Sequence, residues 1–220
     1  MSANCSDRWR RDLPLLNYAA KRPYLYHLTH RENVDYLRET ATLFPAALLM
    51  ERSGRIELLR ARRRGPVQVH VGEVVVWLRD QGPLYEGHAR FPTGFTFADL
   101  IESLNRRIFF WPGTAAGPIS YGMRHFGAYK KEKPAFLRID FQALLLANPA
   151  AVPRYCKYNS GSPRCSNGVK SPRGTDTFLF AADFDGTPSK VVEVTFDSEI
   201  TLPASTAVGA SPKGPWNRLL

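Results

Sequence analysis

Apolar residues follow two different spacings along this chain, and the spacings predict where strands and helices lie. Runs of β-branched and aromatic residues predict strands over 24–28, 106–111, 135–140, 177–180 and 191–196, and one or two strands over 67–79. Apolar residues three or four positions apart predict helices over 34–41, 46–51, 56–64, 97–104, 121–129 and 141–147.

Polar residues at fixed offsets predict where two of the helices begin. Thr29 and Glu32 have the spacing of a capping box, in which each side chain bonds to a backbone amide at the helix start, and Thr96 and Asp99 have the same spacing. The first box places His27 at the end of a strand and beside a helix N-terminus.

The length of 220 residues suits one domain. We predict a basic lead-in over residues 1–22, a single domain over 23–203 and a loop-like tail over 204–220. Inside the domain, residues 148–174 are rich in Pro, Ser, Asn and Gly and are too long for an ordinary connection. A loop of that length is usually functional or disordered.

Charge is the feature of the composition that bears most on partners. The net charge is +10, and residues 154–174 carry five basic side chains and no acidic one. A basic excess attracts polyanions such as nucleic acids and nucleotides. The alternative is that the charge only keeps the protein soluble and binds polyanions nonspecifically. No apolar run reaches the roughly 18–20 residues that cross a bilayer, so no membrane partner is expected. Only three cysteines occur, which argues against a disulfide scaffold and favours free thiols in a reducing cytoplasm.

His27 and Glu193 are the main candidates for chemistry. His27 is either a half-buried strand residue or a polar group that bonds a ribose hydroxyl or an amide. Glu193 lies in the apolar run 191–196, where an unpaired buried charge costs several kcal/mol. Either this strand is half exposed with Glu193 on its wet face, or the carboxylate is catalytic at the mouth of a cleft. No histidine pair has the spacing of a helical metal site, so no metal is predicted.

Aromatic rings and arginines are the next candidates. The rings over 109–111 and at Tyr121, Phe126 and Tyr129 either belong to the core or include one or two that stack on a planar ligand. Arg164 and Arg173 lie among small residues of the long loop, where guanidinium groups suit phosphate contacts; the alternative is a solvated mobile loop. The absence of Walker A, G-x-G-x-x-G and G-x-S-x-G sequences disfavours P-loop nucleotidases, Rossmann dehydrogenases and α/β-hydrolases.

Taken in order, three short motifs resemble the ADP-ribosyltransferase superfamily, on its His–aromatic–Glu branch. The motif Tyr26-His27-Leu28-Thr29 followed by a helix is similar to the first of that family, residues 108–111 followed by Tyr121 to the second, and Val192-Glu193-Val194 to the third. Order and spacing agree over about residues 24–196. Within the superfamily the chain is similar to DarT-type and related prokaryotic defence toxins, which modify DNA or RNA.

This resemblance implies a fold, a reaction and a set of contacts. The fold is α+β, with a split β-sheet core and flanking helices. The reaction transfers ADP-ribose from NAD to DNA or RNA, or less favourably to protein, releases nicotinamide and needs no metal. Glu193 and His27 would be catalytic, Glu193 by stabilising positive charge on the ribose and His27 by holding the ribose. The residues expected at NAD are Tyr26, His27, Leu28, Thr29, Arg107, Phe109, Phe110 and Tyr121; those expected at the target are Arg79, Arg164 and Arg173. An antitoxin protein is a further expected partner.

Two points stay open. The second motif of the family often begins with tyrosine, whereas Phe109 or Phe110 stands here, so a ring is kept and a hydroxyl is lost. Two other functions also fit the residues. One is a basic nucleic-acid-binding module without catalysis; the other is an NAD-dependent RNA 2′-phosphotransferase, which usually needs a more arginine-centred pocket.

Overall fold

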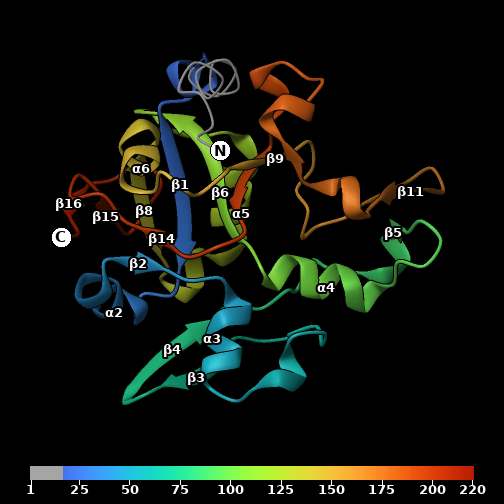
Figure 1. Cartoon of the computed structure of the whole chain (residues 1–220), viewed down its shortest axis with the longest axis horizontal. Coiled ribbons are helices and arrows are strands. Elements are labelled where there is room, and N and C mark those ends of the chain that lie inside the picture. Colours follow the sequence, from blue (N-terminus) through green and yellow to red (C-terminus); the bar gives the residue numbers. More distant parts are fainter. Residues whose placement is uncertain (1–16) are drawn as a thin grey trace, which may run out of the picture.

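The computed structural model describes residues 17–220, and its centre is an antiparallel β-sheet (Figure 1). The strand order across the sheet is β12-β9-β13-β6-β1-β8-β15-β16, and β7 also pairs with β6. These strands are β1 (Tyr24–Thr29), β6 (Ile108–Thr114), β7 (Gly117–Pro118), β8 (Ala135–Asp140), β9 (Arg154–Cys156), β12 (Leu179–Phe180), β13 (Glu193–Phe196), β15 (Ala207–Gly209) and β16 (Asn217–Arg218). The fold is α+β, as predicted.

Both faces of the sheet are buried. Because the side chains of one strand alternate between the two faces, a single strand contributes to both apolar clusters. On β8, Leu137 and Ile139 belong to the main apolar core, whereas Phe136 belongs to a cluster on the opposite face. The helices are α2 (Asn33–Thr40), α3 (Ala46–Arg52), α4 (Phe97–Asn105), α5 (Ser120–Tyr129) and α6 (Phe141–Ala147), and residues 17–21 are also helical. Helices α2 and α6 contribute to the main core, and α5 covers the other face.

Three smaller sheets extend from this core. β3 (Val67–Val71) and β4 (Val74–Leu78) form a hairpin that packs on α3 with its own apolar cluster, and this unit lies below the main sheet in Figure 1. β5 (Ala89–Arg90), β10 (Cys165–Ser166) and β11 (Val169–Pro172) form the second, on the side of α4. β2 (Thr42–Leu43) pairs with β14 (Ile200–Thr201) in the third.

The main sheet opens between β1 and β6. β1 pairs with β8 from Tyr24 to Thr29, but it pairs with β6 only from Tyr24 to Tyr26. On its other edge β6 pairs with β13 through residues 108–110. Over those same residues, the edge of β6 that faces β1 has no partner strand in the described part of the chain. His27 of β1 lies beside this opening, and Glu193 begins β13, which pairs with the other edge of β6.

One of the two expected capping boxes forms and the other does not. The Thr96 hydroxyl accepts from the Asp99 amide, 3.2 Å away, and the Asp99 carboxylate accepts from the Thr96 amide, 2.7 Å away. At the other site β1 continues through Thr29, whose hydroxyl accepts from the side-chain amide of Asn33, 3.1 Å away. Helix α2 therefore begins without a side-chain cap at Glu32.

Four further segments differ from the prediction. The expected helix over 56–64 is only a 3₁₀ turn at Ile56–Leu58, because the arginines that follow bond to distant groups instead of continuing a helix. The 148–174 loop contains β9, β10 and β11, and the tail contains β15, which pairs with β8. Tyr18, expected in the lead-in, is buried in the main core. Within residues 17–220, no helix has the length and apolar character needed to span a bilayer.

Candidate functional site

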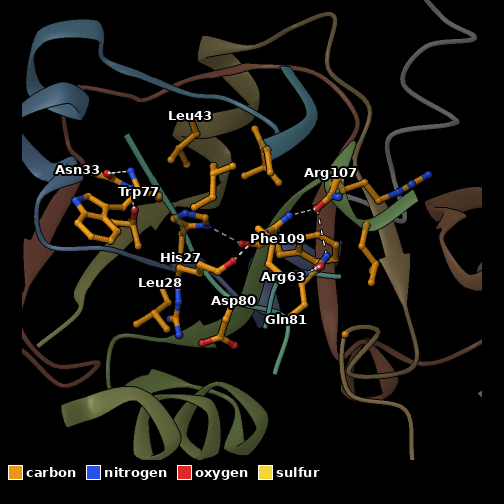
Figure 2. Close-up of a pocket in the computed structure, with 18 of the residues that line it drawn as sticks. His27, Leu28, Asn33, Leu43, Arg63, Trp77, Asp80, Gln81, Arg107 and Phe109 are labelled. Carbon is orange, nitrogen blue, oxygen red and sulfur yellow. Dashed lines mark hydrogen bonds between the residues drawn. The ribbon is translucent and has the colours of Figure 1, made fainter. Parts of the chain in front are cut away.

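A pocket lies where the sheet opens, and both His27 and Glu193 line it. Its volume is about 270 Å³, close to the lower end of the range for small-molecule sites. Strands β1 and β6, the β3–β4 hairpin, helix α5 and the turn over 159–162 contribute its walls. Figure 2 shows His27 and Phe109 between Trp77 and Asn33 at one end and Arg107 at the other.

His27 occupies the gap that β1 leaves beside β6. Its Nδ1 lies 2.9 Å from the carbonyl oxygen of Phe109. Burial lowers the pKa of His27 to about 4, so the ring is neutral at pH 7. A neutral ring beside a carbonyl donates from Nδ1, which leaves Nε2 as an acceptor. The imidazole is therefore held by the strand edge and can accept a hydrogen bond from a ligand hydroxyl.

Glu193 begins β13, and its carboxyl group is almost fully enclosed. The residue is 3% exposed, and its Oε2 accepts a hydrogen bond of 3.1 Å from the amide of Ser160. Burial raises the pKa of Glu193 to about 7, although Ser160 and the positive charge of Arg173 both act to lower it. A carboxyl group that titrates near pH 7 can stabilise positive charge and can also exchange a proton. The alternative of an exposed Glu193 is wrong.

The stability of the protein should depend on pH through Glu193. Because its pKa in the folded state is about 7 against an ordinary value of 4.5, the folded protein binds more protons than the unfolded chain between these values. The free energy of unfolding therefore falls as pH rises through that window. Relative to Glu193→Gln, we expect the free energy of unfolding of the wild type to fall by about 2–3 kcal/mol between about pH 4.5 and pH 8. Urea denaturation of both proteins at several pH values measures this, and parallel pH profiles would contradict it.

Two of the three arginines that line the pocket are bonded to protein groups. Arg63 is 8% exposed and donates from Nε to the Arg79 carbonyl and from Nη1 to the Asn105 side chain, each at 2.8 Å. Arg107 donates from Nη1 to the carbonyl of Ser103, 2.6 Å away, and its Nε lies 3.1 Å from a carboxylate oxygen of Asp197. These two guanidinium groups mainly support the walls.

Arg79 is the third arginine that lines the pocket, and some of its N–H donors have no hydrogen-bond partner. Both Nη atoms are buried and have no hydrogen-bond partner, and burial lowers the pKa of Arg79. The guanidinium group lies 3.7 Å from the centre of the Tyr129 ring, and the nearest carboxylate oxygen, on Glu132, is 3.8 Å away. A buried guanidinium with unpaired donors suits an anionic ligand.

Helix α5 supplies the pocket with His125, which the sequence analysis did not assign to the site, and with Tyr129, for which it left a core role and a ligand contact open. Tyr121, His125 and Tyr129 are four residues apart and share one face of the helix, but only His125 and Tyr129 reach the pocket. The ring centres of Trp111 and His125, and of His125 and Tyr129, are each 4.7 Å apart. Tyr121 instead packs against the guanidinium of Arg124 at 4.5 Å. Trp111, His125 and Tyr129 thus form the aromatic wall that was expected at Tyr121.

The predicted site residues divide into two groups. The pocket brings together His27, Leu28, Thr29, Arg79, Arg107, Phe109 and Glu193. It does not include Tyr26, Phe110, Tyr121, Arg164 or Arg173. The Tyr26 hydroxyl donates to the carbonyl of Thr114 at 2.5 Å, and Phe110 is completely buried in the main core. Arg164 is exposed, outside the pocket.

Arg173 differs most from its predicted role as a surface contact. It is 2% exposed, and its guanidinium group bonds to backbone carbonyls of the segment around Ser160. Alternation of charged and small residues in a loop gives no sign of which arginine will be buried, because that depends on how the loop closes on itself.

Asn33 holds the hairpin against the pocket. Its side-chain amide donates to the Trp77 carbonyl at 2.9 Å and its oxygen accepts from the Trp77 amide at 2.8 Å, so it bonds β4 as a neighbouring strand would. The His30 ring stacks on the Trp77 ring with centres 4.7 Å apart. The partners are distant in sequence, so no local signal predicts this contact.

No group of three or more His, Cys, Asp and Glu side chains among residues 17–220 could hold a metal ion. Cys156 and Cys165 are free thiols, as predicted, and Cys5 lies outside the described residues. Burial raises the pKa of Cys156, which lies opposite Glu193 on β9.

Comparison with known proteins identifies the family. A family model described as a family of unknown function, DUF7002, matches residues 23–206. The chain belongs to the DUF7002 family. No curated protein and no solved structure matches it. The DUF7002 match includes every residue of the pocket, from His27 to Glu193.

Proposed function

We propose that this DUF7002 protein is an NAD-dependent ADP-ribosyltransferase that modifies a nucleic acid. The observation that carries the proposal is the position of His27 and Glu193 on the walls of one pocket, where β1 and β6 stop pairing. The first and third motifs of the resemblance are far apart in the chain, and each contributes residues to this pocket. The split sheet of the ADP-ribosyltransferase fold is part of the same proposal.

Glu193 is the group we assign to the chemical step. When the bond between ribose and nicotinamide breaks, nicotinamide leaves with the bonding electrons and positive charge spreads over the ribose. An ionised Glu193, fixed by the Ser160 amide, stabilises that charge more than it stabilises the uncharged sugar. The target base or hydroxyl then forms a bond to the ribose carbon, and its proton goes to the Glu193 carboxylate.

The other pocket groups suit the remaining parts of NAD. The Nε2 of His27 is free to accept from a ribose hydroxyl, because Nδ1 already bonds to Phe109. The unpaired Nη atoms of Arg79 suit the pyrophosphate oxygens. Phe109 and Trp111 line the pocket with rings against which nicotinamide can pack.

A nucleic-acid target is supported by charge. The net charge is +10, and the second small sheet exposes Arg90 and Lys170, with Arg164 beside it. This sheet connects through the 157–173 segment to the turn that contacts Glu193. A polyanion held here would bind the segment that also carries the Ser160 contact to Glu193.

Incubation with labelled NAD and separate pools of DNA, RNA and protein tests the proposal. We expect label on a nucleic-acid pool, with release of nicotinamide. NAD at 100 times its Kd should stabilise the fold by about 2.7 kcal/mol, a rise in Tm of roughly 5–10 °C. The absence of both effects, combined with salt-sensitive nucleic-acid binding, would instead support the non-catalytic binding module.

The RNA 2′-phosphotransferase remains a second candidate because Arg63, Arg79 and Arg107 line the pocket. That reaction usually needs arginines around a phosphate. Arg63 and Arg107 already bond to protein groups, which is why transfer to a target ranks first. Adding RNA with an internal 2′-phosphate to the same assay separates the two, because only the phosphotransferase removes that phosphate.

A further inference from the structure

One buried side chain, that of Arg173, bonds to the backbone of the turn at residues 159–162. Arg173 donates from Nε to the Ser160 carbonyl at 3.2 Å and from Nη2 to the Asn159 carbonyl at 3.0 Å. Its Nη1 donates to the Pro172 carbonyl at 2.7 Å and to the Ser171 hydroxyl at 3.1 Å. The guanidinium thus closes the loop on itself and fixes the direction of the Ser160 peptide.

The front of the same turn contacts Glu193. Ser160 is completely buried, and its amide is the donor that bonds to Oε2 of Glu193 at 3.1 Å. Arg173 therefore bonds to the carbonyl of the residue whose amide bonds to the carboxylate. In the described residues no carboxylate lies within ion-pair distance of the Arg173 guanidinium, so carbonyls satisfy it and its charge remains unpaired.

The stem of Arg173 is itself anchored. Its amide donates to the Arg90 carbonyl at 2.9 Å, next to the pairing of β11 with β5. The guanidinium lies 4.7 Å from the centre of the Tyr158 ring. Arg173 is thus held at its backbone and at its guanidinium group, so it can fix the position of the turn. An exposed arginine without these contacts cannot do so.

We propose that Arg173 is a positioning residue, which holds the Asn159–Ser162 turn so that the Ser160 amide fixes the Glu193 carboxylate. The proposal rests on the proposed function, in which Glu193 acts on the ribose. It replaces the expected target contact of Arg173 with a role inside the protein. The charge of Arg173 also acts on Glu193 and lowers its pKa.

The titration of Glu193 can be observed without interference from its neighbours. Cys156, opposite on β9, has a pKa raised by burial, and His27 and His125, which line the same pocket, have pKa values lowered to about 4 and about 3. Burial lowers the pKa values of Arg79 and Arg107 from the high ordinary value of a guanidinium group. Between about pH 5 and pH 9, Glu193 is thus the carboxyl, thiol or imidazole of this group that changes charge.

The test compares Arg173→Met with Arg164→Met, because both remove one positive charge from the same basic segment and Arg164 is exposed. The Glu193 carboxyl is titrated by ¹³C NMR without NAD, and Glu193→Gln identifies its resonance. We expect Arg173→Met to raise the pKa of Glu193 by about one unit and Arg164→Met to leave it unchanged. At pH 7 a rise from about 7 to about 8 reduces the ionised fraction about fivefold.

Arg173→Met is then assayed for transfer against the wild type, and Arg164→Met serves as the control for the titration alone. We expect Arg173→Met to lower kcat at pH 7 about fivefold, with a smaller change in KM, and to move the pH profile up by about one unit. Arg173→Lys keeps the charge without the paired carbonyl bonds and should recover part of the shift; it also replaces Arg173→Met if that variant does not fold. An unchanged carboxyl titration in a folded variant overturns the positioning role. If Arg173→Met shifts the titration of Glu193 but the wild type shows no transferase activity, the proposed function alone is refuted.

Discussion

Replacement of Glu193 by glutamine is expected to lower the rate of ADP-ribose transfer about 10²–10³-fold and to leave the fold intact. Glutamine has nearly the same shape and still offers an oxygen to the Ser160 amide, so the hydrogen bond at 3.1 Å can persist. What disappears is the negative charge beside the ribose and the acceptor for the proton of the target. Because a buried carboxyl is costly to ionise, the variant should be at least as stable as the wild type at pH 8.

The measurement is single-turnover transfer from labelled NAD, with circular dichroism and urea denaturation as checks of folding. Glu73→Gln is a matched control, because Glu73 is exposed in the turn between β3 and β4 and lies outside the pocket. We expect the control to retain wild-type activity. Full activity in Glu193→Gln would remove the basis for assigning the chemical step to this residue.

Local sequence patterns were enough to predict most elements of the main sheet. The aromatic and β-branched runs of β1, β8 and β13 follow the two-residue period of a strand with buried faces. The tail was mispredicted because Ala207–Gly209 is short and has no alternating pattern, and it becomes a strand only by pairing with β8. Pairing between distant segments is invisible to a local pattern.

The residues of the candidate site also divide into those that a local pattern predicts and those that depend on contacts between distant segments. His27 and Glu193 could be selected from the sequence because a polar residue in an apolar strand is unusual. Tyr121 is expected at the site because the resemblance implies a ring on this helix, whereas the pocket is lined by His125 and Tyr129, one and two turns further along. Arg164 and Arg173 share one basic segment, and only the closure of that segment buries Arg173 and leaves Arg164 exposed.

Replacement of Arg79 by glutamine is expected to weaken NAD binding about 10–100-fold with little loss of stability. Hydrogen bonds between a charged donor and phosphate oxygens contribute on the order of 1.5–3 kcal/mol, and both Nη atoms are free to make them. In the absence of ligand those atoms have no hydrogen-bond partner, so the variant loses mainly the contact with the Tyr129 ring and the 3.8 Å ion pair with Glu132. The contact of a buried cation with a ring contributes about 2 kcal/mol, and removal of the buried charge recovers part of its desolvation cost. We therefore expect the free energy of unfolding to change by less than about 1 kcal/mol. Calorimetric titration with NAD and urea denaturation measure the two quantities.

Arg63 provides the contrast that makes this prediction specific. Arg63→Gln removes bonds to the Arg79 carbonyl and to the Asn105 side chain, so it should lower the free energy of unfolding by at least about 2 kcal/mol. Arg90→Gln, at an exposed arginine outside the pocket, should change neither stability nor NAD affinity. If Arg79→Gln binds NAD as tightly as the wild type while Arg63→Gln binds it weakly, the anion contact belongs to Arg63, and the unpaired donors of Arg79 do not face the ligand. Loss of affinity confined to Arg79→Gln places the phosphates beside the Tyr129 ring, at the end of the aromatic wall that begins with Trp111.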